Sequence, residues 1–351
     1  MRNVIVCFDS TMPRTGAHDA TNAEVLFRLL DASDDADQVT WYDAGEAALN
    51  SPQLFNPAAR RWRQNTVAAA RRAIVDAYHF IAENWQPQDR IFLLGAGRGA
   101  YCARSLARML GVVGLMTDAD DHFVEYALGA YALPTHSRTR EDWQQVHRLA
   151  CIIQGRSDIA VPVHFLGLWD TVRVPGTPAL SEDDYLDNVL AGRHAVAIDG
   201  GAGPFAECRI GTNDAIEEVW FRGMHCDIVG GRNAYWPLAD ISLDWMLDGV
   251  LAAGASIGET GQRIPAPTEL DALAEGVRSL RFRTAPEGAL VHASVAVYVH
   301  AHPSYWQRLP ARFQWCDLDW AARAERLPAK PPALEEPAAA EDSDELTAVA
   351  S

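Results

Sequence analysis

Residues 91–99 read Ile-Phe-Leu-Leu-Gly-Ala-Gly-Arg-Gly, an apolar run that enters a glycine-rich turn before a helical stretch at 100–110. The spacing matches the frame Gly-x-Ser-x-Gly of a nucleophile elbow, with Gly97 at the position of the serine. In that turn the small flanking residues allow a strand and a helix to approach closely, and the serine hydroxyl attacks an ester carbonyl. The sequence therefore predicts a hydrolase scaffold without its usual nucleophile.

Two polar residues follow later predicted strands. Asp170 comes after the buried run 161–168, and His225 comes after the run 215–221. The order of elbow, acid and histidine is that of the α/β hydrolases. In a working triad His225 would take the proton of the nucleophile, while Asp170 would orient the imidazole and stabilise its charged form.

An oxyanion hole could be formed by backbone N–H groups that do not depend on the side chain at position 97. The N–H of Arg98 is one candidate, and the loop Asp9-Ser10-Thr11, which follows the strand 4–8, supplies another.

The glycine turn, Asp170 and His225 each also have an ordinary structural explanation. The glycine turn could bind a phosphate, Asp170 could cap a turn, and His225 could be a loop histidine. Their occurrence together in this order, each at a strand end, favours the hydrolase interpretation.

The elements that position these residues alternate between strands and helices. Buried or amphipathic patterns predict strands at 4–8, 38–42, 90–94, 161–168, 193–198 and 215–221, and helices at 22–30, 66–84, 100–110, 118–155 and 238–251. This alternation predicts an α/β fold of the α/β-hydrolase-like type, with a mostly parallel central sheet and helices on both faces. We expect one domain over 1–327, with helical lid insertions at about 115–155 and 172–192. Residues 328–351 are acidic and rich in proline and alanine, which predicts a disordered tail.

Composition narrows the class of protein. The formal net charge of −17 argues against nucleic-acid binding, which requires an excess of lysine and arginine. Six cysteines without Cys-x-x-Cys spacing indicate reduced thiols. Because the sequence enters a predicted strand at once, we expect no signal peptide, and the sequence contains no apolar run that could span a membrane. We expect a cytoplasmic protein, or one exported without a cleavable signal.

The chain also resembles a known group, the α/β-hydrolase domain family that includes the type VI secretion phospholipase effectors. The resemblance covers roughly residues 2–310 and rests on ordered blocks around the features above. These blocks include Asn3–Asp9, Thr21-Asn22, Trp41–Gly45, Gly95–Arg104, Phe165–Val172, His194–Asp199, Val219–Gly231 and Leu238–Met246. It implies esterase chemistry on lipids, with Asp170 as the acid and His225 as the base.

The chain departs from the family pattern at two positions. The resemblance implies a serine where Gly97 stands, and a glycine where Ser10 stands. The first departure predicts a catalytically impaired protein that acts by binding a small-molecule or lipid ester, or a protein partner through the acidic tail. The alternative is an active hydrolase that uses Ser10 as a replacement nucleophile, or a water molecule activated by His225 and Asp170.

Other chemistry finds less support in the sequence. Cys102 and Cys226 are further nucleophile candidates, but we expect Cys102 to pack against the sheet and Cys226 to point away from His225. Asp9, Asp170, His225 and Asp227 could approach a divalent cation, yet their spacing matches no metal signature. The prediction is therefore no metal and no cofactor.

Overall fold

The computed structural model describes residues 1–9, 20–33, 35–45, 57–116, 121–178, 184–201, 208–211, 213–258, 266–275 and 279–322. In this part of the chain an eight-stranded sheet has the order β2-β1-β3-β4-β5-β6-β7-β8. Every pair of neighbouring strands in it is parallel. The strands are β1 Asn3–Phe8, β2 Gln38–Asp43, β3 Arg90–Ala96, β4 Phe165–Trp169, β5 Gly192–Ala197, β6 Ile216–Phe221, β7 Ala289–His292 and β8 Phe313–Cys316.

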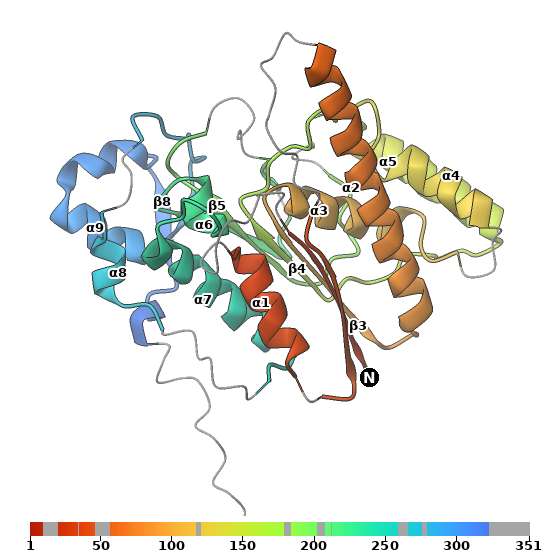
Figure 1. Cartoon of the computed structure of the whole chain (residues 1–351), viewed down its shortest axis with the longest axis horizontal. Helices are drawn as coiled ribbons and strands as arrows, with labels where there is room; N and C mark the ends of the chain where they lie inside the picture. Colours follow the sequence, from red (N-terminus) through yellow and green to blue (C-terminus); the bar gives the residue numbers. More distant parts are fainter. Residues whose placement is uncertain are drawn as a thin grey trace, which may run out of the picture.

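Helices cover both faces of the sheet (Figure 1). They are α1 Asn22–Asp31, α2 Pro57–Asn84, α3 Arg98–Val112, α4 Asp121–Tyr131, α5 Arg140–Gln154, α6 His225–Val229, α7 Trp236–Ala252, α8 Glu269–Leu273 and α9 Ser294–Ala301. Two 3-10 helices follow at Pro303–Arg308 and Trp320–Ala322. No helix of the described part is both long and apolar enough to cross a membrane.

The alternation of side chains along each strand divides the core into two layers. On β1, Val4, Val6 and Phe8 pack toward α2 and α3. Ile5 and Cys7 point to the opposite face, where α1 and α7 cover the sheet. All five side chains are fully buried, as expected of a parallel strand with helices on both faces. The α/β class predicted from the sequence is confirmed, and the architecture is consistent with an α/β-hydrolase-like fold.

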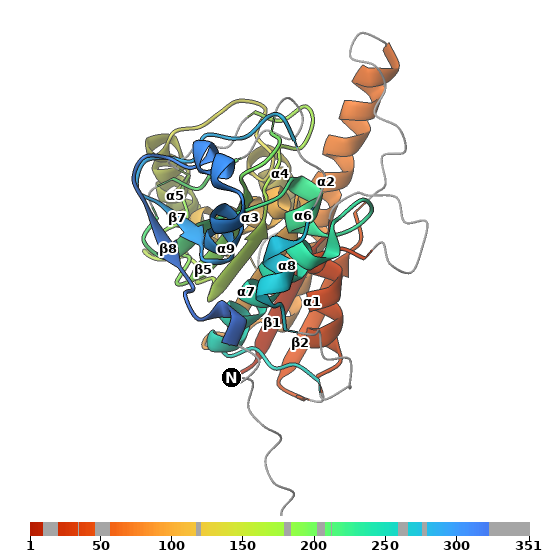
Figure 2. The same ribbon diagram turned by 90° about the vertical axis from the view of Figure 1, so that its left-hand side faces the viewer.

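Several predicted boundaries need correction. Helix α2 begins at Pro57 rather than Thr66, and its N-terminal part extends beyond the body of the molecule (Figure 2). Strand β4 starts at Phe165, because 161–164 forms only an isolated bridge between Val163 and Val189.

The two predicted insertions differ in structure. Helices α4 and α5 lie within 115–155. The described parts of 172–192, which were expected to form a helical insertion, contain turns and bridges and no helix. Pro175, Gly176 and Pro178 interrupt helical hydrogen bonding in this segment. Residues 328–351, predicted to be a tail, lie outside the described residues, as do Ser10 and Thr11.

Candidate active site

The turn at Gly97 joins a strand to a helix, as the sequence predicts. Strand β3 ends at Ala96 and α3 begins at Arg98. Gly97 between them has φ 56° and ψ −109°, a conformation that L side chains rarely adopt. The elbow backbone is therefore present without the elbow side chain.

Glycines on either side of the turn are required by close packing. A Cβ atom on Gly95 would lie 2.6 Å from the carbonyl oxygen of Gly99. A Cβ atom on Gly99 would lie 2.2 Å from the carbonyl oxygen of Phe8, so α3 rests directly on β1. The three glycines thus serve two purposes: Gly95 and Gly99 permit close packing, and Gly97 adopts the positive φ.

Backbone hydrogen bonds attach the turn to the end of β4. The N–H of Gly97 donates to the carbonyl oxygen of Trp169 at 2.8 Å, and the N–H of Val172 donates to the carbonyl oxygen of Gly97 at 3.1 Å. These bonds place Asp170, which lies between Trp169 and Val172, beside the elbow.

Asp170 and His225 form a direct hydrogen bond. Nδ1 of His225 lies 2.6 Å from Oδ2 of Asp170. Asp170 is completely buried, and the His225 side chain is 11% exposed. An ionised carboxylate only accepts hydrogen bonds, so Nδ1 carries the proton and Nε2 of the neutral ring remains an acceptor. This is the orientation that a histidine base requires.

His225 is the first residue of the short helix α6, whereas the sequence interpretation placed it on an extended segment. Helical geometry, rather than strand alternation, therefore sets the direction of the neighbouring Cys226. Burial raises the pKa of the Cys226 thiol to about 11, with contributions from Asp227 and Asp170. Cys102 is buried in the core, and burial also raises the pKa of its thiol. Neither environment favours the thiolate that a cysteine nucleophile requires.

Arg283 is a member of the cluster that sequence reasoning missed. Its Nη2 donates to Oδ2 of Asp170 at 3.0 Å, and its Nη1 donates to Oδ1. The N–H of Ala197 also donates to Oδ1, at 3.0 Å. Burial has the largest effect on the pKa of Asp170 and would raise it. The charge of Arg283 and the contacts of His225 outweigh that effect and hold the pKa well below its usual range.

The residue after Asp170 is held by a second histidine–carboxylate pair. The N–H of Thr171 donates to Nε2 of His194 at 3.3 Å, so the proton of the neutral ring lies on Nδ1. That atom is 3.1 Å from Oε2 of Glu218. Asp170 itself has φ 40°, a rare and strained value for a residue other than glycine. The hydrogen bond between Thr171 and His194 helps to hold the backbone in this conformation.

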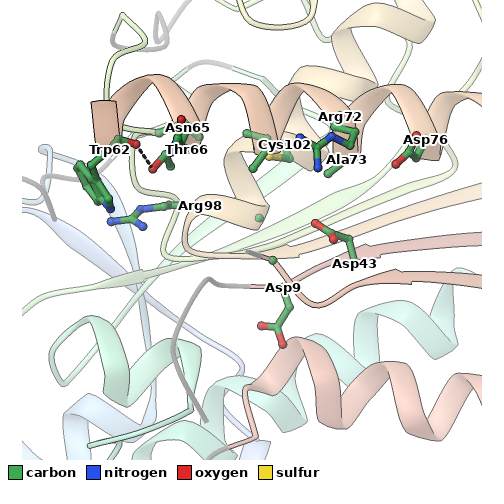
Figure 3. Close-up of a pocket in the computed structure, with 15 residues that line it drawn as sticks. Asp9, Asp43, Trp62, Asn65, Thr66, Arg72, Ala73, Asp76, Arg98 and Cys102 are labelled. Atoms are coloured by element: carbon green, nitrogen blue, oxygen red, sulfur yellow. Dashed lines mark hydrogen bonds between the residues drawn. The ribbon is translucent and has the colours of Figure 1, made fainter. Parts of the chain in front are cut away.

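The predicted oxyanion loop is described only at Asp9. Its carboxylate accepts hydrogen bonds from the hydroxyl groups of Thr21, at 2.5 Å, and Tyr42. Figure 3 shows the Asp9 side chain turned toward α1 and away from Arg98. The side chain therefore holds the end of β1 against the start of α1.

A cavity of about 390 Å³ adjoins the elbow (Figure 3). Helix α2, the first turn of α3 and the ends of β1 and β2 line it. The guanidinium of Arg98 lies 5.6 Å from the ring centroid of Trp62, and its burial lowers the pKa of Arg98. The volume falls in the range of small-molecule pockets.

The acidic residues considered as metal ligands have other partners. Asp227 accepts hydrogen bonds from the N–H groups of Met224 at 2.8 Å and Tyr235 at 2.9 Å. Within the described ranges, no group of three or more His, Cys, Asp or Glu side chains is placed to hold a metal ion.

A family model described as the catalytic domain of Tle1-like phospholipase effectors of the type VI secretion system matches residues 2–249. The chain belongs to this family. The Tle1-like region thus contains Gly97, Asp170 and His225, whereas Arg283 lies beyond it.

Individual relatives are distant and longer. The uncharacterized protein YEL023C of Saccharomyces cerevisiae is 28% identical over 222 aligned positions, in a match that covers 59% of this chain and 32% of the yeast protein. The Tle1 effector, solved bound to the VgrG spike, is 16% identical with a TM-score of 0.37, covering 65% of this chain and 51% of that one. An uncharacterized Pseudomonas aeruginosa protein is 16% identical with a TM-score of 0.40, covering 73% and 46%. The chain thus spans about a third of the yeast protein and about half of each solved one.

Proposed function

We propose that this Tle1-like chain is a phospholipase- or esterase-like protein of the α/β-hydrolase fold that is impaired in ester hydrolysis and acts by binding a ligand or partner. Family membership supports the lipid-ester class. The absence of a side chain at Gly97 supports the impairment.

The backbone of Gly97 is the observation that carries the proposal. It has the positive φ of a strained strand-to-helix turn, and it is hydrogen-bonded to the segment that carries Asp170. No hydroxyl is available there to form an acyl-enzyme. Loss of a triad nucleophile lowers kcat by about 10⁶-fold, and binding with an oxyanion hole retains about 10³- to 10⁴-fold over water.

The cavity beside the elbow supports a binding role. Its volume of about 390 Å³ suits part of a lipid or another small ester. Arg98, which borders the cavity and follows Gly97 directly, offers a cationic group at one end. Binding of a protein partner through the acidic tail at 328–351 is the other form of the proposed binding role.

A second candidate function is hydrolysis by another route, and the intact His225–Asp170 pair favours it. The carboxylate oxygens of Asp170 are occupied by His225, Arg283 and Ala197. A water molecule would therefore have to lose its proton to Nε2 of His225. The other route uses the hydroxyl of Ser10.

Turnover of short nitrophenyl esters and of phospholipid in mixed micelles distinguishes these functions. We expect the unmodified chain to show at most the residual acceleration of about 10³- to 10⁴-fold over water, with no difference between it and His225→Ala. Robust turnover that His225→Ala abolishes would refute the impairment. Ser10→Ala would then separate the two hydrolytic routes, since unchanged activity excludes the serine.

A further inference from the structure

Arg283 reaches the site from a segment outside the family-matched region. Its N–H donates to the carbonyl oxygen of Ile198 at 2.9 Å, and the N–H of Gly200 donates to that of Arg281 at 2.8 Å. This antiparallel pairing places residue 283 beside the end of β5. A Cβ atom on Gly201 would lie 2.4 Å from Cγ of Arg283, so the glycine leaves the room that the arginine occupies.

The guanidinium contacts both oxygens of Asp170. Oδ1 accepts from Arg283 and from Ala197, and Oδ2 accepts from Arg283 and from His225. These four bonds account for about four acceptor sites, the full capacity of a carboxylate. With both side chains buried, the carboxylate plane cannot rotate without breaking two charge-assisted hydrogen bonds.

We infer that Arg283 is the positioning residue of the His225–Asp170 pair. Its planar fork fixes the rotation of the Asp170 carboxylate, directs Oδ2 to Nδ1 of His225, and so holds the neutral imidazole in the Nδ1–H tautomer. Nε2 is thereby kept as the acceptor. The inference rests on the proposed function for the identity of the site, but its first test does not require turnover.

The competing role for Arg283 is compensation of a buried charge alone. A lysine at this position would supply the same charge, but its ammonium group lacks the planar pair of donors that the guanidinium of arginine has. The positioning role requires two parallel donors, which lysine does not present. Arg283→Lys therefore separates the two roles while retaining the charge and hence the best chance of folding.

The experiment records the ring nitrogens of the full-length chain, ¹⁵N-labelled at histidine, by NMR from about pH 6 to about pH 9. His225→Gln assigns the signals of His225. We expect a single Nδ1–H tautomer in the unmodified chain, and loss of at least half of that population in Arg283→Lys and Arg283→Met. Arg308→Lys is the matched control, because Arg308 pairs with Asp199 and bonds to Ser279 without touching Asp170.

Retention of the native tautomer in folded Arg283→Lys would overturn the positioning role. Backbone amide spectra establish folding, and if Arg283→Met fails to fold, Arg283→Lys decides alone. In the Gly97→Ser background we also expect Arg283→Lys to lower kcat by about 10-fold or more with little change in KM. If Gly97→Ser gives no turnover, the proposed function is wrong. The tautomer measurement does not depend on turnover and still tests the positioning role of Arg283.

Discussion

Gly97→Ser is the substitution that the geometry singles out. The turn already has the backbone angles of an elbow, and Gly95 and Gly99 already permit the close approach of β3, α3 and β1. The change adds a hydroxyl to a turn that is hydrogen-bonded to the segment carrying Asp170, whose Oδ2 lies 2.6 Å from Nδ1 of His225. We expect Nε2 of His225 to accept the proton of the new hydroxyl.

The expected gain follows from two opposing effects. A complete triad nucleophile contributes about 10⁶-fold to kcat. A hydroxyl misplaced by about 1 Å forfeits about 10²-fold of that. We therefore expect Gly97→Ser to raise kcat on nitrophenyl esters by about 10⁴-fold. A residue other than glycine at positive φ costs about 1–3 kcal/mol, so the free energy of unfolding should fall by that amount.

Gly97→Ala provides the control, because it has the same backbone strain without a hydroxyl. Initial rates, a burst of nitrophenol equal to the protein concentration, and the mass of the chain after reaction with a fluorophosphonate report the acyl-enzyme chemistry. His225→Ala in the serine background should abolish all three signals. If Gly97→Ser is folded, as stable as Gly97→Ala, and neither labelled nor faster, the degenerate-elbow account is refuted.

Three further predictions concern stability. Gly99→Ala should destabilise the fold by about 3 kcal/mol in urea unfolding, because its Cβ would meet the carbonyl oxygen of Phe8. Gly129→Ala on α4, where nothing lies within 4 Å of the new Cβ atom, should raise the free energy of unfolding by about 0.5–1 kcal/mol. Equal effects of Gly99→Ala and Gly129→Ala would contradict the close packing of Gly99 against β1. Burial has the largest effect on the pKa of Glu218 and would raise it. The hydrogen bonds that Glu218 accepts from His194 and from the N–H of Ile210, together with the charge of Arg209, outweigh burial and lower the pKa to about 2. The stability that Glu218 contributes, about 3 kcal/mol, is present above about pH 4.5 and lost as pH falls toward about 2. Glu218→Gln should flatten that acid limb, and an unchanged slope would rule out this source.

The parts of the fold predicted correctly from the sequence have strong local patterns. The apolar run Val4–Phe8 could only be a strand buried on both faces. The helix predicted at 22–30 is α1, and Thr21 caps it, since the hydroxyl of Thr21 accepts the N–H of Glu24 at 3.1 Å. The glycine spacing at 95–99 located the strand-to-helix turn to the residue.

The parts that were missed lack such patterns. Residues 57–65 are mostly polar, so the start of α2 shows no apolar face for periodicity to detect. Strands β7 and β8 contain only four residues each. Arg283 is separated from Asp170 by 113 residues, and no spacing rule links two such positions. Only the folded chain brings them together.

The position of β7 and β8 after residue 249 has a consequence for any shortened version of this protein. A fragment that stops where the family match ends would leave the outer side of β6 with open amide and carbonyl groups, a template for intermolecular β-pairing. It would also bury the Asp170 carboxylate without its guanidinium counterion. Such a fragment would self-associate, and a recombinant domain of this protein should extend at least through the 3-10 helix at Trp320–Ala322.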